Sequence, residues 1–198
     1  MTDYTTLAAV RSQLNIDDSQ TGDDTLISTY VTQASRTIDA LTGRSFTGTN
    51  GTMTYDCCEP TVIGRKLFFD QDVIDVYSVV NGDGETVTSS EYRLLPSNHT
   101  PKYALELLPS SNKIWTYDVD WQGAITVAGT LGKCLDADRP ADITLAATKL
   151  AAWLYQNRDN AEQTVRYADG SSEVPAQAPA LVLKILTDGG YMRLGLKT

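Results

Sequence analysis

The sequence is poor in the residues that build disulfide frameworks and metal sites. Its 198 residues include three cysteines and one histidine. Cys57 and Cys58 are adjacent and Cys134 stands alone, so these residues predict no disulfide framework. Their spacing also matches no zinc pattern, which needs four ligands at characteristic intervals. We therefore expect free thiols that pack as small apolar side chains.

The sequence also lacks long apolar runs and an excess of basic residues. No apolar run approaches the roughly 18 residues that a membrane span needs. The start, MTDYTTLAAV, lacks the charged and then apolar pattern of a signal peptide. Lys and Arg number 16 against 25 Asp and Glu, for a formal net charge of -9. Because tight nucleic-acid binding needs basic residues that displace counterions, this balance argues against it. We expect a soluble protein with no membrane partner.

No catalytic constellation is visible. The single histidine, His99, is flanked by Asn98 and Thr100 and is expected in an exposed loop rather than as a general base. No nucleophile elbow, Walker loop or Gly-x-Gly-x-x-Gly motif is present. Residues 118–123 begin like a calcium loop, but Gly129 occupies the twelfth position, where a bidentate Glu is needed. The sequence therefore predicts no enzyme, no cofactor and no metal site.

The first 43 residues have the periodicity of two helices. Thr5 or Thr6 can cap a short helix that runs to about Leu14. Asp23 or Asp24 can cap a longer helix, and Gly43 supplies the left-handed residue that ends it. One arc of the longer helix is apolar, which predicts that it packs on a core. The residues of that arc are Leu26, Ile27, Tyr30, Val31, Ala34, Ile38 and Leu41.

From Phe46 the apolar period shortens to about two, which indicates strands. Asn81-Gly82-Asp83-Gly84 is the strongest turn signal and predicts a hairpin. About eight short strands at this spacing predict an antiparallel barrel or sandwich. The expected strands are residues 52–55, 66–69, 73–80, 85–88, 92–95, 103–108, 114–117 and 124–128.

Helical periodicity returns near Pro140. The helix expected from there to about Ala161 has a wide apolar arc rich in alanine, so it can pack on more than one side, including against a neighbouring subunit. Residues 167–178 are expected to form a loop, and Pro179 opens a last helix. The fold class is therefore α+β. Residues 1–48 and 135–188 are expected to form a helical bundle, residues 49–134 an inserted β domain, and residues 189–198 a C-terminal arm.

Two segments resemble a known family. LAAVRSQLNIDDSQTGDDTLISTYVTQASRTIDALTGRSF, residues 7–46, is similar to the N-terminal helix pair of tailed-phage head-to-tail connector proteins, which ends in a Thr-Gly-Arg-Ser/Thr-Phe sequence. Pro140-Ala141-Asp142-Ile143, followed by residues 150–158 with their Trp-Leu-Tyr-Gln-Asn-Arg ending, is similar to the family's Pro-x-Asp-Ile helix. Together the two matches cover about a third of the chain, in the family's order.

The resemblance implies a structural adaptor at the head-tail interface of a virion, assembled in the host cytoplasm. It would form a ring, expected to be a dodecamer, below the portal protein, and would dock the next neck or tail protein, such as a stopper. DNA would pass through the ring without specific binding. The apolar arm and the end of the third helix are the expected partner interface: Trp153, Tyr155, Arg158, Tyr191, Met192, Arg193, Leu194 and Leu196.

A second interpretation concerns the aromatic residues of the β segment. Trp115, Tyr117 and Trp121 lie close together in the sequence and could form a sugar-binding platform of a virion adhesion module. No basic or amide residues cluster beside them, so packing within the β domain is the simpler interpretation. The carbohydrate-binding module remains the alternative function.

Overall fold

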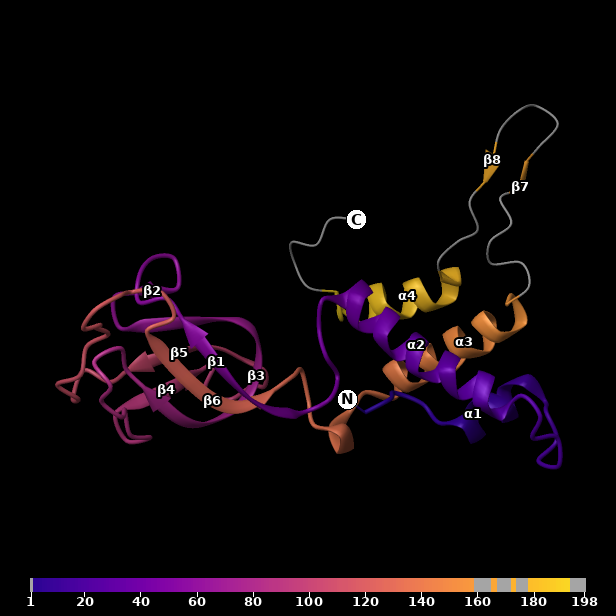
Figure 1. Cartoon of the computed structure of the whole chain (residues 1–198), viewed down its shortest axis with the longest axis horizontal. Helices are drawn as coiled ribbons and strands as arrows, with labels where there is room; N and C mark the ends of the chain where they lie inside the picture. The colour runs from indigo at the N-terminus through magenta and orange to yellow at the C-terminus, as the bar shows by residue number, and fades with distance from the viewer. Residues whose placement is uncertain (1, 159–164, 167–171, 174–177, 193–198) are drawn as a thin grey trace. The chain divides into compact units, whose positions relative to one another are not determined.

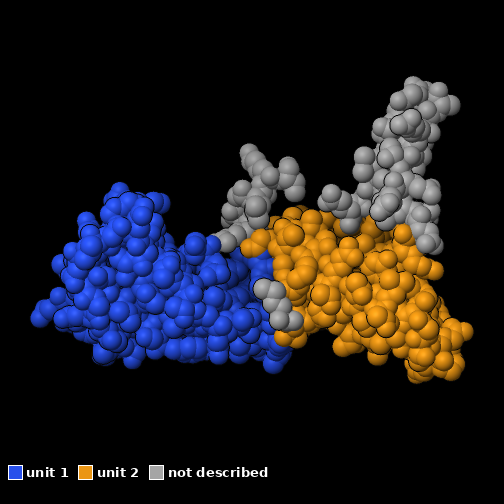
Figure 2. Space-filling model, in the orientation of Figure 1, with its two compact units in different colours: residues 1, 44–138 blue, residues 2–43, 139–198 orange. Residues whose placement is uncertain are grey.

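The chain divides into two compact units in a computed structural model that describes residues 2–158, 165–166, 172–173 and 178–192. One unit comprises residues 44–138 and is a β unit; the other comprises residues 2–43 and 139–198 and is helical (Figure 2). The expected α+β class is confirmed. Among the described residues, no helix combines the length and apolar character needed to cross a membrane.

The helical unit begins with α1 (Leu7–Leu14) and α2 (Asp24–Thr42). The Thr6 side chain caps α1 by accepting a hydrogen bond from the Ala9 amide at 3.2 Å. Gly43 ends α2 with φ 64°, the left-handed conformation that glycine adopts without steric cost. Both helices therefore begin and end where the sequence predicts.

The second half of the helical unit comprises α3 (Ala141–Gln156) and α4 (Ala180–Asp188). α3 packs against α1, α2 and α4, and is the central helix of the unit (Figure 1). Its wide apolar arc is therefore covered by helices of the same chain, which accounts for packing on more than one side. The buried residues of the arc are Ile143, Ala146, Ala147, Leu150, Ala151 and Ala152.

The β unit contains one open antiparallel sheet. Its strands are β1 (Thr49–Tyr55), β2 (Val62–Ile63), β3 (Lys66–Val80), β4 (Tyr92–Leu95), β5 (Lys102–Leu107) and β6 (Ile125–Leu131). The order is β1-β6-β3-β5-β4, with β2 paired to β3. The two ends of this order are not paired with each other, so the expected barrel or sandwich is wrong. A short 3-10 helix, Asp136–Asp138, follows the sheet.

The long strand β3 takes the place of two of the expected strands, residues 66–69 and 73–80. Its first part pairs with β5 and its second part with β6, and the register shifts between Phe68 and Val73. Such bulges bend a strand without ending it. Asp70 therefore lies within β3, where the sequence suggested a break between two strands.

Two other expected strands are single bridges. Thr86 makes an isolated bridge with Val80, and Tyr117 makes one with Gly82. Each of these two segments, residues 85–88 and 114–117, is therefore a connection with one bridge and not a strand of the sheet. The core beneath the sheet is nonetheless continuous, and its fully buried members are Leu67, Val73, Val79, Leu105, Leu107, Ile125 and Val127.

The connection between α3 and α4 contains a short antiparallel pair, β7 (Val165–Arg166) with β8 (Ser172–Glu173). No strand was expected there, and β8 lies within the loop expected at residues 167–178. α3 itself ends at Gln156, earlier than the expected end near Ala161. Most of the loop expected at residues 167–178 lies outside the described residues.

Candidate partner-binding surfaces

The last turn of α3 holds the first group of expected interface residues. Tyr155 is half-buried, and its hydroxyl donates a hydrogen bond to the Asp23 carboxylate at the start of α2. Its ring meets the Tyr30 ring edge to face, with centroids 6.4 Å apart and an interplanar angle of 78°. Tyr155 therefore joins α3 to α2 and presents only part of its surface to solvent.

Arg158 covers the exposed side of Tyr155. Its guanidinium carbon lies 4.5 Å from the ring centroid, within cation–π distance, and Nη1 donates to the Tyr155 carbonyl at 2.9 Å. The pKa of Tyr155 is raised, first because its hydroxyl donates to Asp23 and second because of burial. Tyr155 therefore stays protonated, and Arg158 is held as an exposed planar cation above it.

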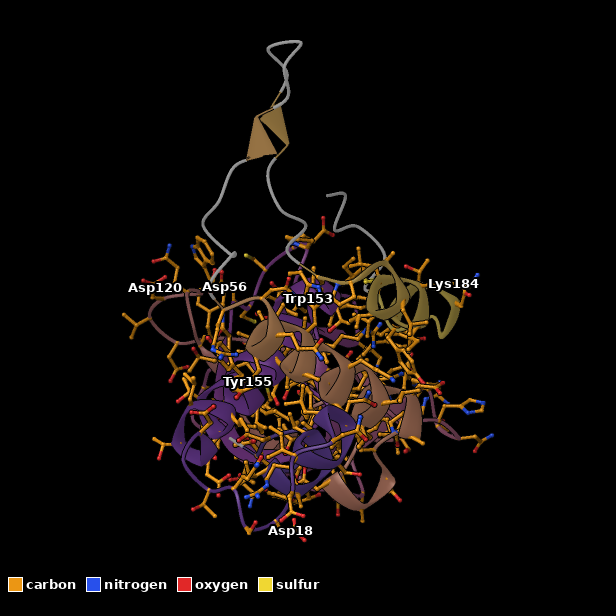
Figure 3. All side chains as sticks on the ribbon, turned by 90° about the vertical axis from the view of Figure 1, so that its right-hand side faces the viewer. Asp18, Asp56, Asp120, Trp153, Tyr155 and Lys184 are labelled. Carbon is orange, nitrogen blue, oxygen red and sulfur yellow. The ribbon has the colours of Figure 1, made fainter. Side chains whose placement is uncertain are left out.

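Trp153 does not join this cluster. It lies two residues before Tyr155, and side chains at that spacing point to different sides of a helix. Figure 3 looks onto this end of the helical unit and shows the two side chains apart. Trp153 is half-buried, and its carbonyl accepts from the Asn157 amide at 3.0 Å. Trp153 and Tyr155 thus lie on different sides of α3.

Tyr191 and Met192 lie at the other end of α3. Both are half-buried, and the Tyr191 hydroxyl lies 3.4 Å from a carboxylate oxygen of Asp142, in the first turn of α3. Thirteen residues of helix separate Asp142 from Tyr155, a rise of about 20 Å. The described residues of the expected interface therefore fall into two groups at opposite ends of α3: an α3-end surface (Tyr155 and Arg158, with Trp153 on another side of the helix) and an α4-end surface (Tyr191 and Met192). The remaining three, Arg193, Leu194 and Leu196, lie outside the described residues.

The aromatic residues of the β unit are not equivalent to one another. Trp115 packs against the sheet core, and its indole N–H donates to the Arg65 carbonyl at 3.0 Å. Tyr117 and Trp121 are partly exposed, at 45% and 38%. With Trp115 engaged in the core, the three residues do not form the exposed sugar-binding platform of the alternative interpretation.

The described residues also supply little for chemistry. Within them, no group of three His, Cys, Asp or Glu residues is placed to hold a metal ion. In the segment that resembles a calcium loop, Asp120 Oδ1 accepts from the Gln122 amide at 3.1 Å, a contact typical of a polar turn. Burial raises the pKa of Cys57, which disfavours its reactive thiolate form.

Sequence reasoning missed the residues that support the helix pair. Arg11 is 6% exposed, and its Nη1 donates to both carboxylate oxygens of Asp24, at 2.8 and 3.0 Å. It also donates to the Asp17 carbonyl and so holds the loop between α1 and α2. An arginine on a short amphipathic helix carries no local signal that distinguishes burial from exposure.

Tyr4 anchors the segment before α1. It is 1% exposed, its amide donates to Ser35 Oγ at 2.9 Å, and its hydroxyl donates to Asp39. The guanidinium carbon of Arg139, just before α3, lies 4.8 Å from its ring centroid. One N-terminal side chain therefore connects α2 with the segment that leads into α3.

A comparison with known protein families matches the part of the chain that contains Tyr4 and Arg11. Residues 4–61 match the model of a family described as phage gp6-like head-tail connector protein. The resemblance to head-tail connectors is confirmed. The matched connector segment contains Tyr4, Arg11, α1, α2 and β1. A comparison with curated protein sequences finds no match.

Three solved structures share the fold over at least 90% of this chain. A chain in the neck of an empty gene transfer agent (GTA) particle, computed with C6 symmetry, has 16% identity and a TM-score of 0.58; 96% of this chain and 90% of that chain are covered. A chain in the virion of a native GTA particle has 17% identity, a TM-score of 0.60 and the same coverage. A third, from the neck of a native GTA particle computed with C12 symmetry, has 19% identity, a TM-score of 0.50 and coverages of 90% and 86%. At these identities the likeness establishes a shared fold.

Proposed function

We propose that the protein is a structural adaptor in the neck of a phage or phage-like virion. The observation that carries this proposal is the agreement of two comparisons. A connector family matches residues 4–61, and chains from GTA particles, two of them from the neck, share the fold over at least 90% of this chain. The chain is not an enzyme in this proposal, since its described surfaces suit partner binding and the matched family is one of connectors.

The adaptor assembles as a ring between the portal protein and the next neck or tail protein. The C6 and C12 symmetries of two similar neck structures support a closed ring, for which we propose twelve copies. A cyclic ring uses two different surfaces of each subunit, one toward each neighbour. The α3-end and α4-end surfaces, about 20 Å apart along α3, meet that requirement as partner contacts.

The two compact units have different roles in this proposal. The helical unit, residues 2–43 and 139–198, builds the ring. The β domain, residues 49–134, is inserted between the two halves of the helical unit. It lies on the outside of the ring or contacts the next neck protein. Residues 189–198 form the arm. Each unit has a core of its own, which supports assigning the two units separate partners.

The negative charge of the chain fits a ring through which DNA moves. With a net charge of -9 on each copy, a closed ring accumulates many negative charges. Acidic walls repel phosphates within about a Debye length, roughly 8 Å at physiological salt. Exposed carboxylates such as Asp18, in the loop between α1 and α2, are candidates for this wall (Figure 3). Their replacement by lysine should slow the passage of DNA through the ring. DNA ejection at the wild-type rate would refute this role of the carboxylates.

Portal binding tests the proposal directly. The purified chain is mixed with portal protein from the same particle, and the complexes are weighed by native mass spectrometry. The proposal predicts a complex with several copies of the chain on one portal ring. A chain that stays monomeric beside portal would refute it. A monomer in the absence of portal decides nothing, because assembly depends on the partner.

A pair of arginine variants makes the test specific. Arg158→Ala removes the exposed cation above Tyr155, and Arg93→Ala removes an exposed cation from the β unit. We expect Arg158→Ala to weaken portal binding about tenfold or more, the loss typical of an interface arginine. Arg93→Ala should leave it unchanged. Equal effects of the two variants would exclude the α3-end surface from the contacts that assemble the ring on the portal.

A further inference from the structure

Residues 117–121, Tyr-Asp-Val-Asp-Trp, form an exposed loop of the β unit in which large apolar side chains alternate with aspartates. The apolar members are Tyr117, Val119 and Trp121, which are exposed at 45%, 95% and 38%. Apolar residues scattered singly over a surface are normal, whereas a group of them marks an interaction site. The five residues lie within a span of about 14 Å, because each residue of a chain reaches at most about 3.5 Å. We call this segment the acidic-aromatic loop.

The acidic-aromatic loop is fixed to the rest of the β unit at both ends. At its start, the Asp118 amide donates to the Gly82 carbonyl at 3.3 Å, and Tyr117 makes a β-bridge with the same glycine. At its end, the Trp121 carbonyl accepts a hydrogen bond from the Cys57 amide at 2.8 Å. The exposed side chains are therefore presented by a backbone that is already ordered, which lowers the entropy cost of binding a partner.

Three carboxylates surround these apolar side chains. Asp118 and Asp120 are exposed members of the loop. Asp56 lies beside it, since its Oδ1 accepts a hydrogen bond from the Gly123 amide at 2.8 Å (Figure 3). Among the described residues, no ion pair involves any of the three. Because burying an unpaired charge is costly, a partner that covers the loop has to bring cations to these carboxylates.

We propose that the acidic-aromatic loop docks on a neighbouring protein of the particle, in an apolar pocket bordered by lysine or arginine. Tyr117, Val119 and Trp121 fill the pocket, and tyrosine and tryptophan are enriched among the residues that dominate protein interfaces. Asp118 and Asp120 pair with the cations of its rim. The same carboxylates repel DNA and anionic membranes, so the charge favours a protein as the occupant. The docking rests on the proposed neck function and specifies the partner contact of the β unit.

Photo-crosslinking in the assembled particle tests the docking. Val119 is replaced by p-benzoylphenylalanine, the particles are purified and irradiated, and the crosslinked peptides are identified by mass spectrometry. The matched control carries the same group in place of Ile63, which is 50% exposed on β2 of the same unit. We expect position 119 to crosslink to one other structural protein of the particle, close to a lysine or arginine, with at least about five times the yield of position 63.

Charge supplies a second readout. Asp118→Lys places a cation against the cationic rim of the pocket, so it should lower the crosslinking yield at position 119 severalfold. Asp18→Lys makes the same change in an exposed loop of the helical unit and should leave the yield unchanged.

Three results would overturn the docking in particles that contain the chain: equal yields at positions 119 and 63, equal effects of the two lysine variants, or crosslinks only to a second copy. Particles that lack the chain would refute the neck function itself, and the docking with it.

Discussion

Arg11 joins α1 to the start of α2 through an ion pair that is almost closed to solvent, and its replacement tests how the helical unit is held together. Its side chain is 8% exposed and that of Asp24 is 27% exposed. Arg11→Met keeps most of the apolar stem but removes the donors to Asp24 and to the Asp17 carbonyl. The Arg11 Nε has no hydrogen-bond partner, so the variant loses no bond at that atom.

The size of the effect follows from the exposure of Asp24. Removing one partner of a fully buried ion pair costs about 3–5 kcal/mol. Asp24 keeps contact with water and is the first residue of α2, where the helix dipole stabilises its negative charge. We therefore expect Arg11→Met to lower the free energy of unfolding of the helical unit by about 2 kcal/mol. Adding Asp24→Ala should recover part of this loss, since no carboxylate is then left without its cation.

Urea denaturation followed by circular dichroism at 222 nm measures the helical unit. The midpoint should fall while the slope is unchanged. Arg93→Met is the matched control: Arg93 pairs with Glu106 in the β unit, but its side chain is 56% exposed, so the pair should contribute at most about 1 kcal/mol. If the Arg11 and Arg93 variants lose the same stability, the anchoring role assigned to Arg11 is refuted.

Three further predictions follow from the structure. Gly43→Ala should destabilise the helical unit by about 1 kcal/mol, measured by thermal unfolding, because Gly43 has φ 64°; no change would contradict the cap. Gly129→Ala should disrupt the sheet, because its Cβ would fall 2.2 Å from the Asp75 carbonyl oxygen, whereas Gly22→Ala meets no atom within 4 Å; equal solubility and melting of both would contradict this. Burial raises the pKa of Asp39 above its ordinary 3.8, so the folded state favours the protonated carboxyl. The contribution of this group to the free energy of unfolding is therefore fully present below pH 3.8 and is lost as pH rises. The free energy of unfolding of wild type should therefore fall relative to that of Asp39→Asn between pH 4 and pH 7, as measured by urea denaturation. A rise over the same range would contradict the raised pKa.

The helices were predictable because their signals are local. Thr6, Gly43 and the apolar arc of α2 each act within one or two turns of the chain, so they can be identified without knowing the fold. The resemblance to connectors rested on these same residues. The end of α3 was harder to place, because the chain continues in helix-compatible residues beyond Gln156.

The sheet and the candidate surfaces depend on contacts between distant residues. Whether Asp70 ends a strand is decided by the partners of β3, which change from β5 to β6 at that point. Whether Tyr155 is exposed is decided by Asp23 and Tyr30, more than 120 residues away. The sequence predicts Trp153 and Tyr155 together as partner contacts, whereas the structure places them on different sides of α3.

Electron microscopy of the chain bound to its portal tests the central claim most directly. The account predicts a closed ring of copies on the portal, with the helical units forming the ring, and a density for the β unit attached to each copy. Single copies scattered on the portal, or a portal with no added density at saturating chain, would contradict the assignment as a neck adaptor.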